Sequence, residues 1–322
     1  MFCCLLTIQV CMIIKTVHVF HSNMSTIIIF ILAQWFEALL AKIIFFPYQI
    51  GLVTVGNNAK VFQFWITKWP SEMPQIEETS ELTPLLFSGT LFLHYAFTLT
   101  FSIFMLTCER ACATFFINDY EKKPRAYICI TLLLLVHITT LSLSYLSICE
   151  ILSFATAIAI AGIMIIFAVV HFFIILRINI AIQKRLDDHN QQQLYYSLAV
   201  RFQAKENARS LELAKKVVLF TSFSILIGLV LLVVIVMHWM DEHIAVMVTF
   251  AEAAFNLNPL IIVPVGMYSV PMWRERYCQS SRCLLRIQKL RIRNTQKVSA
   301  ITENMAAKES EIYFNQLSEA WK

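Results

Sequence analysis

The sequence predicts an all-α membrane protein built as a bundle of seven transmembrane helices. Hydrophobic residues make up 58% of the chain, charged residues make up 15%, and the mean hydropathy is +0.66. A soluble domain carries roughly 25% charged residues, so this composition excludes one. A transmembrane β-barrel would show alternating segments of about ten residues. The apolar runs here are continuous and longer, which favours helices.

Seven apolar segments follow one another along the chain. Their approximate ranges are 1–14, 24–46, 84–108, 126–147, 151–176, 217–239 and 243–268. A helix needs about 20 residues to cross a bilayer, so all segments but the first are long enough. The first segment is therefore predicted to be either a truncated helix or a short helix that does not cross the membrane fully. Most prolines lie between segments, as expected because an interior proline interrupts the helical hydrogen bonds; Pro259 and Pro264 are the exceptions.

The distribution of lysine and arginine predicts that the N-terminus lies outside and the C-terminus inside. With the C-terminus inside, most of the 26 basic residues fall on the cytoplasmic side, as the positive-inside rule requires. We expect residues 1–270 to form the membrane domain, and residues 271–322 to form a cytoplasmic amphipathic helix and a mobile tail. Cys278 and Cys283 are candidates for palmitoylation beside that helix, or alternatively ordinary reduced thiols.

Four separated blocks of sequence resemble one known family. They are QWFEALLAKIIFFPYQIG (34–51), ERACATFFINDYEKKPR (109–125), RFQAKENARSLELAKKVV (201–218) and NLNPLIIVPVGMYSVPMWRERY (256–277). In order and position they resemble the nematode serpentine receptors of class epsilon, the Sre chemoreceptors. The resemblance covers nearly the whole chain from about residue 15. It implies a receptor resembling G-protein-coupled receptors, in the plasma membrane of chemosensory neurons, that detects an environmental small molecule or pheromone and activates a heterotrimeric G-protein.

Glu109 and Arg110 follow the third apolar segment and are candidates for the switch. We hypothesise that Arg110 pairs with Glu109 or a neighbouring helix at rest and turns to the G-protein when the bundle opens. Asp119 and Tyr120, in the loop that follows, are further candidates for G-protein coupling. The alternative is that these charges mark a helix end at the headgroups and help to set the topology.

The seventh segment contains a candidate hinge at Asn258-Pro259. This region resembles the Asn-Pro…Tyr region in the seventh helix of rhodopsin-like receptors. A proline frees a backbone carbonyl and permits a kink, and Asn258 could satisfy the freed group. The alternative is a kink that does not take part in switching.

Polar residues in the half of the bundle predicted to face outward are candidates for ligand contacts. Ionisable groups inside a membrane are costly enough to indicate function. His94, Tyr95, Glu252 and Asn256 are therefore predicted to line a ligand pocket. The alternative, which applies also to Glu37, is that these side chains hydrogen-bond between helices. The basic segment 201–216 predicts a helix that either transmits motion to the G-protein or binds anionic membrane lipids.

The sequence contains no H-E-x-x-H, Walker-type loop or G-x-S-x-G motif, so we expect no enzyme activity, metal or cofactor. Basic loops interrupted by membrane helices, without interleaved aromatic residues, disfavour nucleic-acid binding. A ligand-gated channel or transporter is an alternative, disfavoured because no internal repeat is present. The short first segment motivates a second alternative, a non-functional truncated receptor.

Overall fold

The computed structural model describes residues 2–53, 79–117, 125–149, 151–187, 198–237 and 239–279. All regular secondary structure in these ranges is helical. The elements are α1 (Phe2–Thr16), α2 (Ser22–Ala33), α3 (Trp35–Gln49), α4 (Thr79–Phe115), α5 (Ala126–Ile148), α6 (Phe154–Asp187), α7 (Leu198–Val236), the short 3-10 helix η3 (Asp241–His243), α8 (Ile244–Asn256) and α9 (Asn258–Ser269). A further helix covers residues 271–279. The chain divides into two compact units, residues 1–273 and 274–322.

Six stretches of the described chain are long and apolar enough to cross a membrane. They are Ser22–Gln49, Leu82–Phe115, Ala126–Ile148, Phe154–Arg185, Ala204–Val236 and Val246–Ser269. The helix α1 adds a shorter apolar helix of 15 residues. The predicted fold class, an all-helical bundle of seven membrane helices with a short first helix, is confirmed. The orientation in the membrane stays a prediction.

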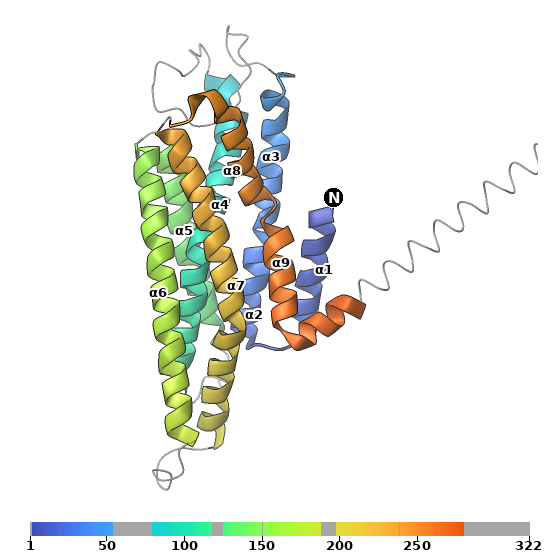
Figure 1. Cartoon of the computed structure of the whole chain (residues 1–322), viewed down its shortest axis with the longest axis vertical. Helices are drawn as coiled ribbons and strands as arrows, with labels where there is room; N and C mark the ends of the chain where they lie inside the picture. Colours follow the sequence, from blue (N-terminus) through green and yellow to red (C-terminus); the bar gives the residue numbers. More distant parts are fainter. Residues whose placement is uncertain are drawn as a thin grey trace, which may run out of the picture. The chain divides into compact units, whose positions relative to one another are not determined.

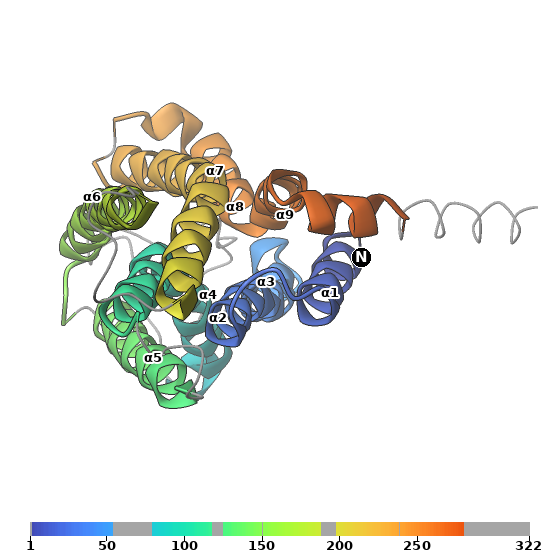
Figure 2. The same cartoon turned by 90° about the horizontal axis from the view of Figure 1, so that it is seen from below.

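Helix α4 lies at the centre of the bundle (Figures 1 and 2). It packs against α2, α3, α5, α6 and α7, while α1 packs against α2 and α9 at one edge. The α4 span is accordingly 61% buried, whereas no other span exceeds 33%. Side chains on α4 are therefore best placed to communicate between distant parts of the bundle.

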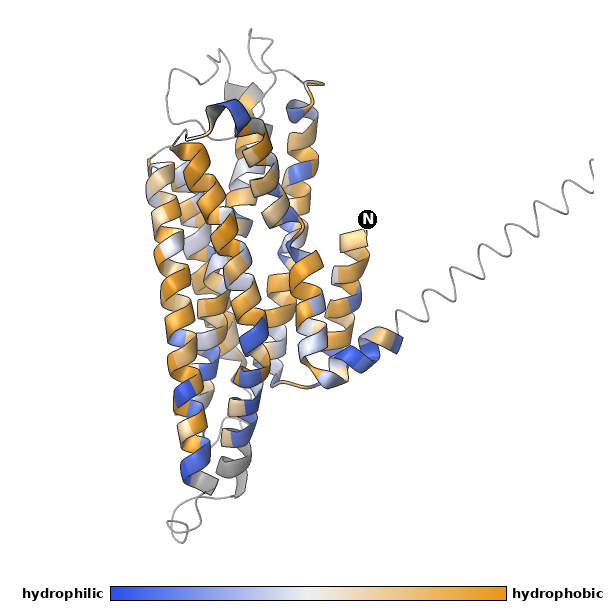
Figure 3. Ribbon diagram, in the orientation of Figure 1, coloured by the Kyte–Doolittle hydropathy of each residue, from blue (hydrophilic) through white to orange (hydrophobic). Residues whose placement is uncertain are grey.

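The helices are apolar over most of their length, and polar residues gather toward the C-terminal end of α6 and the N-terminal end of α7 (Figure 3). On α6 the small residues Ala157 and Ala161 face the interior, while Ile163 and Ile166 are 66% and 63% exposed. A helix that is apolar on all sides is expected where hydrocarbon replaces water as the solvent. The exposed isoleucines are thus explained by lipid contact.

Several helix boundaries differ from the apolar segments of the sequence, and three of the differences bear on the candidate residues. Helix α4 continues to Phe115, so Glu109 and Arg110 lie inside a helix and not at its end. Helix α7 begins at Leu198 and joins the predicted cytoplasmic helix 201–216 to the sixth membrane segment without a break. The seventh segment is divided at Leu257, between α8 and α9, next to Pro259 at the start of α9. The missing N–H of proline explains this break.

Candidate functional site

Glu109 and Arg110 form an ion pair in the interior of the bundle. Arg110 Nε and Nη2 donate to the two carboxylate oxygens of Glu109 at 2.5 and 2.7 Å. The residues are 0% and 1% exposed. Removing two charges from water costs several kcal/mol per ion, and a paired, hydrogen-bonded geometry is needed to offset it. Neither charge can therefore be removed alone without a large cost.

Arg110 also reaches across the bundle to α7. Its Nη1 donates to Asn207 Oδ1 at 3.4 Å, and Asn207 is fully buried. We call Glu109, Arg110 and Asn207 the Arg110 cluster. One turn further along α4, the Thr114 hydroxyl lies 3.0 Å from Asn179 Oδ1 on α6. The same end of α4 is thus tied by polar contacts to both long helices that extend beyond the apolar core.

His21 lies close to this cluster, in the turn between α1 and α2. Its Nδ1 accepts from the backbone N–H of Asn23 at 3.3 Å and so caps the start of α2. Burial lowers the pKa of His21 below its ordinary value of 6.5, and the positive charge of Arg110 lowers it further, against a smaller opposite effect of Glu109. The capping nitrogen is therefore kept unprotonated near neutral pH.

The lowered pKa of His21 predicts that acid destabilises the protein. The unfolded chain takes up a proton near pH 6.5 that the folded chain resists, so the free energy of unfolding falls as pH drops through and below that value. His21→Asn keeps a capping side chain that does not titrate. We expect this variant to show a smaller drop in melting temperature between pH 7.5 and pH 5.5, measured in detergent, than the wild type. The same substitution at the exposed His18 is the control. Equal effects at both positions would contradict the assignment to His21.

His94 takes part in a chain of polar contacts that joins three helices. Its Nδ1 lies 2.7 Å from Glu37 Oε1 on α3, and its Nε2 lies 3.0 Å from Nδ1 of His137 on α5. Gln34, at the break between α2 and α3, hydrogen-bonds Glu37 and lies 3.4 Å from His94 Nδ1. This arrangement matches the interhelical alternative for Glu37.

Glu252 on α8 forms an ion pair with Lys42 on α3, with 2.5 Å between Oε2 and Nζ. Lys42 Nζ also donates to Gln49 Oε1 at 2.6 Å. The Lys42 side chain is 30% exposed and that of Glu252 16%, so this pair is more accessible than the Arg110 cluster. A polar ligand that entered here would have to compete with an existing ion pair.

Tyr95 and Asn256 are placed at the junction of α8 and α9. The Tyr95 hydroxyl donates to the Phe255 carbonyl at 3.2 Å, and Trp35 Nε1 donates to the Asn256 carbonyl at 2.8 Å. Helices α3 and α4 therefore hold backbone carbonyls at the break that the sequence predicted as a hinge. Asn258 and Pro259, the predicted hinge residues, are both buried there.

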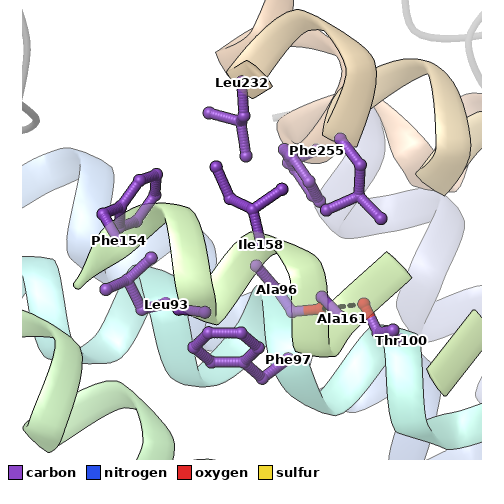
Figure 4. Close-up of a pocket in the computed structure, with 11 residues that line it drawn as sticks. Leu93, Ala96, Phe97, Thr100, Phe154, Ile158, Ala161, Leu232 and Phe255 are labelled. Atoms are coloured by element: carbon purple, nitrogen blue, oxygen red, sulfur yellow. Dashed lines mark hydrogen bonds between the residues drawn. The ribbon is translucent and has the colours of Figure 1, made fainter. Parts of the chain in front are cut away.

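A small apolar cavity, of about 20 Å³, lies between α4, α6, α7 and α8 (Figure 4). Leu93, Phe154 and Phe255 contribute to its wall. Its one hydroxyl, that of Thr100, donates to the Ala96 carbonyl on its own helix at 2.9 Å. Gly228 permits the close approach of the Phe255 ring, because a Cβ at this position would lie 3.0 Å from it. None of the four predicted ligand residues lines this cavity.

Some candidate residues lie outside the part of the chain that the structure describes. Asp119, Tyr120 and Cys283 belong to this group. Cys278 lies on the helix 271–279 and is half-buried with a free thiol. Within the described ranges, no group of three or more histidine, cysteine or acidic residues could hold a metal ion.

An all-helical bundle with six membrane spans, a short apolar first helix and buried polar clusters defines an integral multi-pass membrane protein. The family model described as "Sre G protein-coupled chemoreceptor" matches residues 1–322. The chain therefore belongs to the Sre family of chemoreceptors, as its resemblance predicted.

Curated relatives from Caenorhabditis elegans match nearly the whole chain. Serpentine receptor class epsilon-38 is 30% identical over 321 residues, which cover 97% of this chain and 88% of the relative. Serpentine receptor class epsilon-37 is 30% identical over 333 residues, with coverages of 98% and 86%. No solved structure matches the chain.

Proposed function

We propose that this protein detects a small molecule and passes the signal to a heterotrimeric G-protein. The observation that supports this most directly is the Arg110 cluster. It places a fully buried arginine on the central helix, in contact with α7, the helix that continues furthest past the apolar core.

The geometry suggests how such a switch would operate. The contact of Arg110 with Glu109 is short, and its contact with Asn207 is long at 3.4 Å. A displacement of α7 would therefore break the Asn207 contact first and leave the ion pair intact. Arg110 could then turn toward a G-protein together with Asp119 and Tyr120. A ligand would act by binding the displaced state more tightly, since it can shift the equilibrium only by its differential affinity.

The broken seventh span supplies a place where the bundle could bend. Asn258 and Pro259 begin α9, and Tyr95 binds the last turn of α8. We propose that a ligand between α3, α4 and α8 alters the angle between α8 and α9. Helix α9 packs against α7, so a change in its position would reach the Arg110 cluster.

Nucleotide exchange on purified G-proteins tests the proposed function. The full chain in nanodiscs would be combined with a panel of Gα subunits and a panel of volatile and pheromone-like small molecules. We expect at least one pair in which ligand accelerates exchange. A ligand-evoked ion current that persists without any G-protein would favour a channel and contradict the proposal.

We further propose that His94, Tyr95, Glu252 and Asn256 provide polar ligand contacts. The polar groups of such a ligand would take the place of the Lys42–Glu252 ion pair. Glu252→Gln is expected to raise the half-maximal concentration of a polar agonist by about tenfold, the ratio that 1.4 kcal/mol produces. His94→Ala is expected to have a similar effect. Unchanged dose–response curves in both variants would remove these residues from the ligand site.

A further inference from the structure

A second cavity, of about 90 Å³, lies among α1, α2, α7 and α9, apart from the polar residues proposed above. Figure 2 shows α1, α2 and α9 at the same edge of the bundle. Every side chain that lines the cavity is apolar apart from the indole of Trp273. The indole N–H of Trp273 donates to the Val17 carbonyl at 3.1 Å, so it is not available to an occupant. The cavity therefore selects for a molecule, or part of one, without polar groups.

The cavity is elongated along the helices. Met24, Ile28 and Leu32 line it at intervals of four residues on α2. Eight residues of α-helix rise about 12 Å, which sets the length of this wall. The lining residues on α9 extend from Ile262 to Met267, and Val270 lines the cavity just after the helix ends. This shape fits a linear hydrocarbon chain that lies parallel to the helices.

Water is not expected to fill this space. A buried water needs two or more polar partners, and the lining offers none. An empty cavity would deprive its walls of dispersion contacts. The neighbouring faces of α1 and α9 expose large apolar side chains, among them Leu5, Met12 and Ile261, which indicates that hydrocarbon surrounds the cavity.

A basic residue lies at the end of α1, next in the sequence to a residue of the cavity wall. Ile14 lines the cavity, and the next residue, Lys15, is exposed at the end of α1. A cation beside the end of an apolar channel is complementary to the phosphate of a phospholipid whose chain enters that channel. We propose that this cavity binds one acyl chain of a membrane phospholipid, with the phosphate near Lys15. The bound chain would fill the space between α2 and α7.

Gly266 allows the cavity to be closed by a single substitution. A Cβ at this position would meet only Val217, at an ordinary contact distance of 3.9 Å. A leucine here can therefore enter the cavity without a clash against the backbone. Gly162 on α6 provides the matched control, because a Cβ there meets nothing within 4 Å.

The test uses a phospholipid that carries a photoactivatable diazirine in the middle of one acyl chain. The full chain is placed in nanodiscs containing this lipid, irradiated, and mapped by mass spectrometry. We expect labelling to concentrate on the lining residues of α2, α7 and α9. Gly266→Leu should reduce it about fivefold, the ratio that about 1 kcal/mol of lost binding produces. Gly162→Leu should leave it unchanged. No ligand or G-protein is needed, so the result is independent of the proposed receptor function.

Three results would overturn the proposal. The first is even labelling of all lipid-facing helices, and the second is unchanged labelling in a folded Gly266→Leu variant. The third is selective displacement of the label by free dodecanol, which would assign the cavity to a small aliphatic molecule and not to a phospholipid. If Gly266→Leu fails to fold, as judged by size-exclusion chromatography, Val217→Phe would fill the same cavity from α7. The same reduction in labelling is then expected.

Discussion

Replacing Arg110 by methionine is expected to abolish signalling and to lower the amount of protein at the cell surface. The loss of signalling follows from the proposed role of the guanidinium at the G-protein interface. The loss of protein follows from burial, because Glu109 is 0% exposed and would lose the partner that binds both its oxygens. Leaving a buried charge unpaired typically costs about 3–5 kcal/mol.

A double variant separates these two effects. Arg110→Met combined with Glu109→Gln removes both charges and preserves the approximate volume of the side chains. Replacement of a whole buried ion pair by neutral groups is often neutral or stabilising. We therefore expect surface biotinylation to return toward the wild-type level, while ligand-stimulated nucleotide exchange stays absent. Normal nucleotide exchange in the double variant would show that the ion pair has only a structural role, and it would contradict the proposed switch.

The membrane spans could be predicted from the sequence because a continuous apolar run of membrane length has few alternatives to a helix. The ends of the helices were harder to predict. Glu109 and Arg110 have the pattern of a helix end at the headgroups, but the helix continues to Phe115. The two side chains neutralise each other inside the bundle, so the helix does not have to stop where the charges begin.

The partners of the candidate residues could not be predicted in the same way. Asn207 binds a residue 97 positions earlier in the chain, and Glu37 binds one 57 positions later. These contacts depend on how helices rotate and pack against each other, which is not encoded in local periodicity. The cavity residues carry an even weaker signal, because Leu93 or Met24 looks like any other core residue until its neighbours are known. Small residues such as Ala161 and Gly266 are the one feature of the sequence that could have indicated where the cavities lie.

Asn207→Ala is expected to raise ligand-free activity while ligand-stimulated signalling is retained. The substitution leaves the Glu109–Arg110 pair intact and removes the amide that joins it to α7. Hydrogen bonds to charged groups contribute about 1.5–3 kcal/mol, and the long 3.4 Å contact places this one at or below the lower end of that range. A loss of about 1 kcal/mol would raise the population of the displaced state about fivefold. Basal nucleotide exchange should rise by a similar factor.

Ser210→Ala is the matched control for this prediction. Ser210 is also buried on α7, three residues from Asn207, but its hydroxyl donates to the Glu206 carbonyl of its own helix at 2.8 Å. Both variants remove a buried polar group from the same helix, and one of them also removes a contact with α4. We expect Ser210→Ala to keep the basal rate of the wild type. Equal increases in both variants would mean that loosening α7 is enough for activation, and the specific contact with Arg110 would then have no part in holding the inactive state.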